Sequence, residues 1–147
     1  MSEPAAVQPD AWGERRWRRG VVRSVTDDGH HGFLIDDTDQ FHYFDRRHLL
    51  GATPAPTTIV WFVSRPPLIE GRNPVADPVL ELGAMVSCVV TDLDGTGSGF
   101  ASVLHRTPTP SVPLHEATGL DLGVQFIGRV SGADDTPHVR PARPSAV

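Results

Sequence analysis

Apolar residues along this chain fall into short runs, and nowhere do they repeat with the spacing of a long amphipathic helix. Turn-forming residues, mainly Gly, Pro and Asp, stand between the runs. The pattern therefore predicts an all-β fold made of short strands. In the first part of the chain we expect strands at residues 19–27, 32–36, 40–44, 58–64 and 75–80.

The series of strands then begins again. We expect the second set at residues 84–92, 99–104, 111–114, 123–130 and 138–141, in the same order and with similar spacing. Short matches connect the two sets, since Gly32-Phe33 corresponds to Gly99-Phe100 and Val60-Trp61-Phe62-Val63 to Val124-Gln125-Phe126-Ile127. These matches indicate an internal repeat.

Five short antiparallel strands can close into a barrel, which removes most exposed sheet edge and gives alternate side chains a shared interior. The 147 residues suffice for two barrels, because domains of about 65 residues can fold alone. We expect one barrel at residues 14–81 and a second at 82–143, with flexible tails at 1–13 and 144–147. The predicted core includes Val21, Val25, Leu34, Val60 and Phe62 in the first barrel, and Val86, Val90, Val103, Val124 and Phe126 in the second.

The charge of the chain limits its partners. The formal net charge is −5, and all 13 basic residues are arginines. A net negative chain is a poor candidate for coating duplex DNA, where affinity comes from many phosphate contacts. Binding through aromatic stacking remains open, and arginine can both stack on rings and pair with phosphate.

The chain contains a single cysteine, Cys88, which excludes an intramolecular disulfide and a zinc site built on several thiolates. No run reaches the roughly 18 apolar residues of a membrane span, and no signal-peptide core is recognisable. We therefore expect a cytoplasmic protein with no membrane partner. Arginine in place of lysine is typical of a GC-rich genome, which favours a bacterial source.

Residues 18–80 carry a series of short motifs. Gly20-Val21-Val22-Arg23 comes first, followed by His30-His31-Gly32-Phe33-Leu34 and Gln40-Phe41-His42-Tyr43-Phe44. Val60-Trp61-Phe62 and the stretch at 71–79 complete the series. In this order the motifs resemble the cold-shock domain, a five-stranded barrel of the OB type, with the second and third motifs standing for its two ribonucleoprotein motifs. The resemblance implies two tandem OB-type barrels, the second more degenerate than the first.

The resemblance also implies a surface on which unpaired bases stack, each stack contributing about 1–3 kcal/mol. Tyr43 and Phe44 are consecutive, so one of them is expected to face the core. The segment at 14–19, the only basic cluster along the sequence, is either an arm that adds phosphate contacts or a solvated charge run. In the first case Trp17 stacks on a base or packs over the barrel end. The expected nucleic-acid-binding residues are Trp17, Arg18, Arg23, His31, Phe33, Phe41, Tyr43 and Phe44.

Several positions depart from the family pattern. Ser24, Gly29 and His31 replace an aromatic, a basic and a phenylalanine residue of the family. Acidic residues at the strand ends should repel phosphate and weaken binding; they are Asp27, Asp28, Asp36, Asp37 and Asp39. Of ten aromatic residues only Phe100 and Phe126 lie in the second half, so we interpret that half as a barrel kept for packing, spacing or a protein contact.

No motif indicates catalysis. The chain has no Gly-x-Ser-x-Gly element, and the stretch at 92–99 fits a hairpin turn better than a calcium or phosphate loop. Four histidines in neighbouring segments could bind a transition metal, but stacking or solvent exposure accounts for them better; they are His30, His31, His42 and His48. We expect a non-enzyme with no catalytic residue, no metal site and no cofactor.

Two hypotheses follow. The first is a binding protein for single-stranded RNA or DNA, with RNA favoured by the family resemblance, acting as an RNA chaperone or a regulator. The second is an adaptor whose barrels bind a protein within a ribosome-, polymerase- or phage-related assembly. The acidic charge, the degenerate motifs and the nearly aromatic-free second half favour the second.

Overall fold

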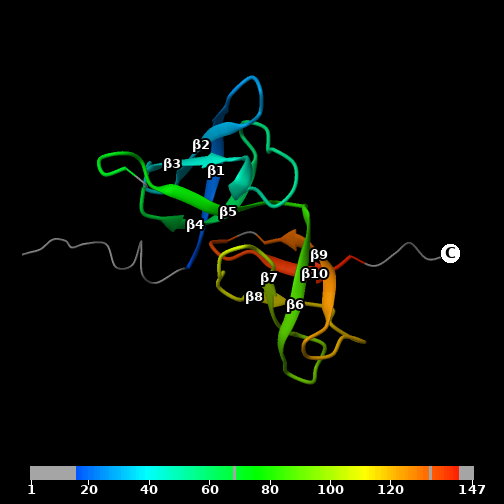
Figure 1. Cartoon of the computed structure of the whole chain (residues 1–147). Coiled ribbons are helices and arrows are strands. Elements are labelled where there is room, and N and C mark those ends of the chain that lie inside the picture. Colours follow the sequence, from blue (N-terminus) through cyan, green and yellow to red (C-terminus); the bar gives the residue numbers. More distant parts are fainter. Residues whose placement is uncertain (1–15, 68, 133, 143–147) are drawn as a thin grey trace, which may run out of the picture.

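The computed structural model describes residues 16–67, 69–132 and 134–142, which contain ten strands (Figure 1). Every predicted strand is present, and no end is displaced by more than two residues. Within these ranges the helical structure is one 3-10 turn, η1 (Arg46–His48), and no helix there is long and apolar enough to cross a membrane. The strands are β1 (Trp17–Val25), β2 (His31–Asp36), β3 (Phe41–Asp45), β4 (Ile59–Arg65), β5 (Val75–Glu81), β6 (Met85–Leu93), β7 (Gly99–Val103), β8 (Val112–Leu114), β9 (Gln125–Ser131) and β10 (His138–Pro141).

The strands form two closed barrels with the same topology. The order around the first is β1-β2-β3-β5-β4, and around the second it is β6-β7-β8-β10-β9. In each barrel the third and fifth strands pair in parallel, and the first and fourth strands pair antiparallel to close the sheet. The predicted fold class, two five-stranded barrels in tandem, is therefore confirmed.

Both barrels carry a β-bulge at the same place in the first strand. The register of β1 against β2 shifts between Val22 and Ser24, and that of β6 against β7 shifts in the corresponding position. A Cβ atom on Gly32 would lie 2.6 Å from the Ser24 carbonyl oxygen, and one on Gly99 would lie 2.0 Å from that of Asp92. The close backbone approach at each bulge therefore requires the glycine of the repeated Gly-Phe pair.

The core confirms most of the predicted apolar residues and corrects two. Val21 is 37% exposed, because the alternation of β1 turns Val22 inward and Val21 outward. Val124 precedes β9 and is exposed to the same extent. Val25 and Phe126 are half-buried against the core. The remaining predicted residues are buried: Leu34, Val60, Phe62, Val86, Val90 and Val103.

The two barrels share one apolar cluster. Trp17, Trp61 and Leu80 of the first barrel belong to the same buried cluster as the core of the second. The indole Nε1–H of Trp17 donates to the Pro110 carbonyl at 3.1 Å, and that of Trp61 donates to the Asp134 carbonyl at 2.8 Å. Buried tryptophans with their N–H groups satisfied make this a packed contact between the barrels.

Candidate nucleic-acid interface

The outer face of β2 and β3 carries four ring side chains. Side chains alternate along each strand, so Leu34 and Phe44 point into the barrel while their neighbours point out. In the pairing of the two strands Phe33 lies opposite Tyr43, and Ile35 lies opposite Phe41. We call the outward set the platform; it consists of His31, Phe33, Phe41 and Tyr43.

The platform rings contact one another mainly through their edges. Phe33 meets Phe41 at 6.4 Å between ring centroids and Tyr43 at 5.8 Å, both in T-shaped geometry. His31 stacks on Tyr43 at 5.9 Å, and its Nδ1 lies 2.6 Å from the Tyr43 hydroxyl. These contacts hold the four rings beside one another on the outer face of β2 and β3.

A hydrogen-bonded turn borders the platform. The Asp45 carboxylate caps η1 by accepting from the Arg47 backbone N–H at 2.9 Å, and it also accepts from the Arg47 guanidinium at 2.8 Å. Burial alone would raise the pKa of Asp45, but the hydrogen bonds from Arg47 outweigh it and lower that pKa to about 2. Burial first, and then the Asp45 carboxylate, raises the pKa of Tyr43, which therefore keeps its hydroxyl proton.

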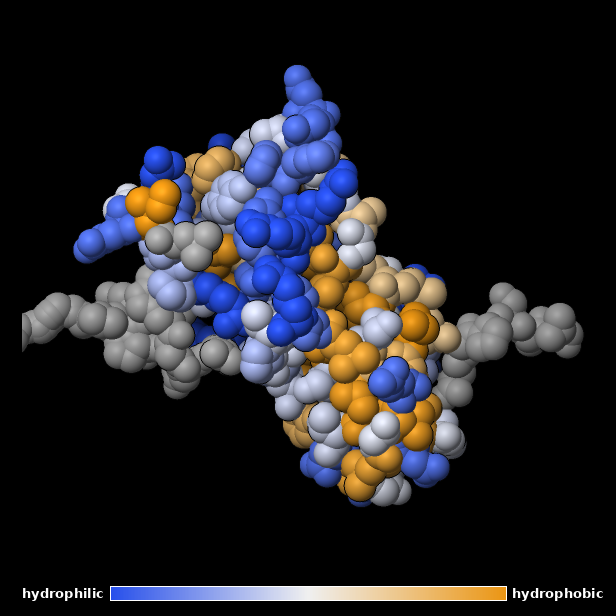
Figure 2. Space-filling model, in the orientation of Figure 1, coloured by the Kyte–Doolittle hydropathy of each residue, from blue (hydrophilic) through white to orange (hydrophobic). Residues whose placement is uncertain are grey.

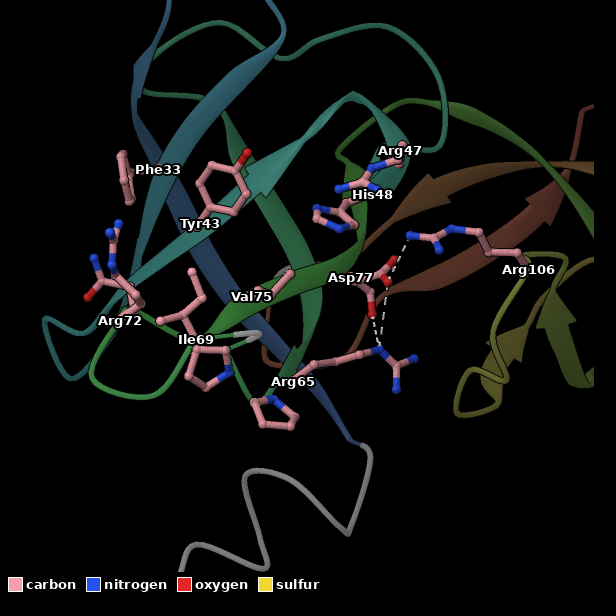
Figure 3. A pocket seen from close by; sticks show the side chains of 13 residues that line it. Phe33, Tyr43, Arg47, His48, Arg65, Ile69, Arg72, Val75, Asp77 and Arg106 are labelled. Carbon is pink, nitrogen blue, oxygen red and sulfur yellow. Dashed lines mark hydrogen bonds and ion pairs between the residues drawn. The ribbon is translucent and has the colours of Figure 1, made fainter.

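An open cavity of about 570 Å³ adjoins the platform (Figure 3). Phe33 and Tyr43 form one wall, and the loop between β4 and β5 forms another. Four arginines and one aspartate line it, a formal charge of +3 in a chain whose net charge is −5. The charged lining residues are Arg47, Arg65, Arg72, Arg106 and Asp77. The cavity therefore joins aromatic rings to concentrated positive charge.

Two of the expected binding residues are buried, which corrects their assignment. Trp17 is 5% exposed in the cluster shared by the barrels, so its ring packs over the barrel end. Phe44 is fully buried, and Tyr43 is the outward residue of that pair. Neither buried ring is accessible to a base.

The other expected residues lie at the surface or near it. The four platform residues share one outward face. Arg23 is exposed at the bulge of β1, beside β2. Arg18 is half-buried, with its guanidinium 3.9 Å from the Asp36 carboxylate. Within the basic segment, Glu14 and Arg15 lie outside the described residues.

The four histidines that could have formed a metal site do not converge. His42 points into the barrel, where its Nε2 lies 2.9 Å from Ser64 Oγ, and burial lowers its pKa to about 4. His48 accepts the Asp45 backbone N–H through Nδ1 at 3.0 Å. In the described part of the chain no group of three His, Cys, Asp or Glu side chains is placed to hold a metal ion.

Sequence reasoning missed the arginines of the cavity. It singled out the segment at 14–19 as the only basic cluster, whereas four arginines far apart in sequence meet at the cavity. Arg106 belongs to the second barrel, so its position depends on how the barrels pack. No local pattern signals such a cluster.

The corresponding face of the second barrel has a different chemistry. Phe100, 45% exposed, stands where Phe33 stands in the first barrel, but its cross-strand partner is Pro113 instead of an aromatic residue. Figure 2 shows apolar side chains gathered on the second barrel, in the region where Figure 1 places β6 and β9. The exposed large apolar residues of this barrel are Met85, Phe100, Leu104, Leu122, Val124 and Ile127.

Comparisons with known proteins found little. No family model matches the chain, and no curated protein matches it. One matching solved structure is a Drosophila chain described as "drosophila Unr CSD456", with 12% sequence identity and a TM-score of 0.37. The match covers 90% of this chain, which spans 63% of the length of that one. The description of the two barrels therefore rests on their own strand order and packing.

Proposed function

We propose that this chain is a single-stranded nucleic-acid-binding protein that holds unpaired bases on the platform of its first barrel and catalyses no reaction. One observation carries the proposal: four rings share one outward face, and two of them, Phe33 and Tyr43, line a cavity together with four arginines. Stacking contributes about 1–3 kcal/mol per base and tolerates any sequence, because every base has a π face. Bases in a duplex have no free face, so the platform should select single strands.

Two of the five acidic residues near the platform have carboxylates that accept local hydrogen bonds. Asp36 is buried, and its carboxylate accepts from Thr38 and Gln40. The exposed Asp28 carboxylate accepts from the Thr26 hydroxyl and the His30 backbone N–H. These two carboxylates serve local turns.

We propose RNA as the favoured strand and a role as an RNA chaperone or regulator. Both choices rest on the resemblance of residues 18–80 to the cold-shock family, since fold and stacking alone do not specify a role. A ribose-reading group would have to contact the 2′-hydroxyl.

The test is a fluorescence-anisotropy titration of the full chain with labelled single-stranded RNA and DNA of mixed sequence, at two salt concentrations. A duplex of the same sequence is the control. We expect micromolar or tighter binding to the single strands and much weaker binding to the duplex. Absence of single-strand binding at low salt would overturn the proposal.

The second candidate is a protein-binding adaptor, and the exposed apolar side chains of the second barrel favour it. Under this proposal the face around Met85 and Ile127 holds a protein of a larger ribosome-, polymerase- or phage-related assembly. The test is affinity purification with and without nuclease, using wild type and an Ile127→Glu variant. A defined partner that survives nuclease and is absent with the variant would support the adaptor; disappearance of every partner on nuclease treatment would contradict it.

A further inference from the structure

The cavity beside the platform is completed by the second barrel. Arg106, which follows β7, reaches across to β5 of the first barrel, where its guanidinium lies 3.3 Å from the Asp77 carboxylate (Figure 3). His105 contributes a second contact, with its Nε2 2.6 Å from the other carboxylate oxygen of Asp77. Asp77 is buried, so this pair of contacts fixes the segment that carries Arg106.

Arg65 ties the same two segments together from the opposite side. Its Nε donates to the Asp77 backbone carbonyl at 2.9 Å. Its terminal nitrogen donates to Thr107 Oγ1 at 3.0 Å and to the Pro108 carbonyl at 3.1 Å, both in the second barrel. This end of the cavity is therefore built by contacts between barrels, and Arg65 and Arg106 are held before any ligand arrives.

Cationic side chains outnumber carboxylates in the cavity lining. The single Asp77 carboxylate faces both Arg65 and Arg106. Arg72, on the loop between β4 and β5, forms no ion pair with any residue that the structure describes. A wall with surplus guanidinium groups attracts an anion, and the planar guanidinium fork suits phosphate.

The two ends of the cavity differ in chemistry. Phe33 and Tyr43 offer ring surfaces at one end, and Arg65 and Arg106 gather around Asp77 at the other (Figure 3). Its volume of about 570 Å³ lies within the range of roughly 300–1,000 Å³ that small-molecule sites occupy. A nucleotide has the same division, with a flat base at one end and an anionic phosphate at the other.

We infer that the cavity holds one nucleotide of the bound strand, with its base against Phe33 and Tyr43. One of its two flanking phosphates lies against Arg106 at the Asp77 end, and the other lies against Arg72, beside Phe33 at the ring end (Figure 3). The second barrel thereby supplies part of the nucleic-acid site instead of serving for packing alone. This inference rests on the proposed single-strand binding and adds a residue outside the first barrel to it.

The test compares Arg106→Ala with Arg140→Ala in the full chain. Both arginines belong to the second barrel, have side chains about half exposed (52% and 55%) and pair with a carboxylate, but Arg140 pairs with Glu116, away from the cavity lining. Labelled single-stranded RNA is titrated over a range of salt concentrations. We expect Arg106→Ala to weaken binding about tenfold and Arg140→Ala to leave it within about twofold.

The salt dependence separates a phosphate contact from a structural effect. Removing one arginine–phosphate interaction on a single strand should reduce the slope of log K against log salt by about 0.7. We expect that reduction for Arg106→Ala and also for Arg72→Ala, which removes a cavity charge without touching the contact between barrels. Matching thermal unfolding curves for the variants and wild type check that the fold is retained.

The outcomes distinguish the two proposals. If wild type binds the strand and both cavity variants behave like Arg140→Ala in affinity and slope, this inference is wrong while the proposed function stands. If wild type binds no single strand, the proposed function fails and the inference fails with it. Competition with an unlabelled nucleoside monophosphate tests whether the bound nucleotide belongs to the strand. Displacement of the strand only at large excess supports a nucleotide of the strand. Tight binding of the free mononucleotide overturns that assignment.

Discussion

The two barrels share one architecture and differ in what they display. Strand order, the parallel pairing of the third and fifth strands, and the bulge opposite a glycine are the same in both. On the outer face, Phe33 and Tyr43 lie opposite each other in the first barrel, whereas Phe100 and Pro113 lie opposite each other in the second. Closing a small barrel thus constrains the inward positions, while the outward positions are free to carry different chemistry.

The two barrels also differ at one buried position. Because Tyr43 and Pro113 are equivalent by register, the residue before each is equivalent too, so buried His42 in the first barrel corresponds to buried Val112 in the second. One barrel therefore buries a titratable ring where the other buries an apolar side chain. Equivalent positions of this kind allow the residue of one barrel to be tested in the other.

We expect the largest loss of stability from a substitution in the apolar cluster that both barrels share. Trp61 is fully buried in the shared cluster, so Trp61→Ala should lower the free energy of unfolding by about 3–5 kcal/mol. Because the cluster spans both barrels, we expect one shifted transition in urea unfolding followed by circular dichroism. Val21→Ala, an outward position on the same barrel, should change stability by less than about 0.5 kcal/mol. Two transitions, one of them unshifted, would show that the barrels unfold independently.

The ten strands could be predicted because they are short apolar runs separated by turn residues. Whether a single residue points into the barrel or out of it could not always be predicted. Val21 and Val22 are consecutive valines, and only the bulge and pairing of β1 decide that Val22 faces inward. The platform was predicted from the two motifs that carry Phe33 and Tyr43. The burial of Trp17 and the position of Arg106 depend on how the barrels pack against each other, which no local pattern records.

The buried histidine should make the first barrel sensitive to pH. Burial lowers the pKa of His42 from 6.5 to about 4, so between these values the unfolded chain takes up a proton that the folded chain does not. Stability should therefore fall as pH falls from about 6.5 to 4, by about 3 kcal/mol for this group. His42→Val copies the second barrel and should remove that part of the fall in urea unfolding measured across this range.

A second histidine, His48, also contributes to the dependence of stability on pH. Burial lowers the pKa of His48 as well, so a residual loss of stability at acidic pH should persist in His42→Val. A variant with the same pH dependence as wild type would show that His42 does not stay neutral in the fold. Since both barrels share a core, the pH effect is expected in the transition of the whole chain.

Binding of single-stranded RNA should depend on one of two phenylalanines whose exposed fractions are similar. Phe41 is 41% exposed on the platform, and Phe100 is 45% exposed on the second barrel. Phe41→Ala should cost about 1–3 kcal/mol of binding to single-stranded RNA, the range for one base stack. Phe100→Ala should leave binding within about twofold, because it lies outside the platform and the cavity. Equal anisotropy titrations for both variants and wild type would contradict the platform.

The smallest effect is expected on the outer face of the second barrel. Ile127 is 46% exposed on β9, and Ile127→Thr keeps a β-branched side chain while removing apolar surface. Stability should change by less than about 0.5 kcal/mol, because an outward side chain contributes little to the core. RNA affinity should be unchanged. Urea unfolding at two protein concentrations checks the comparison: a larger loss of stability that grows with protein concentration would show that this face packs against a second copy of the chain.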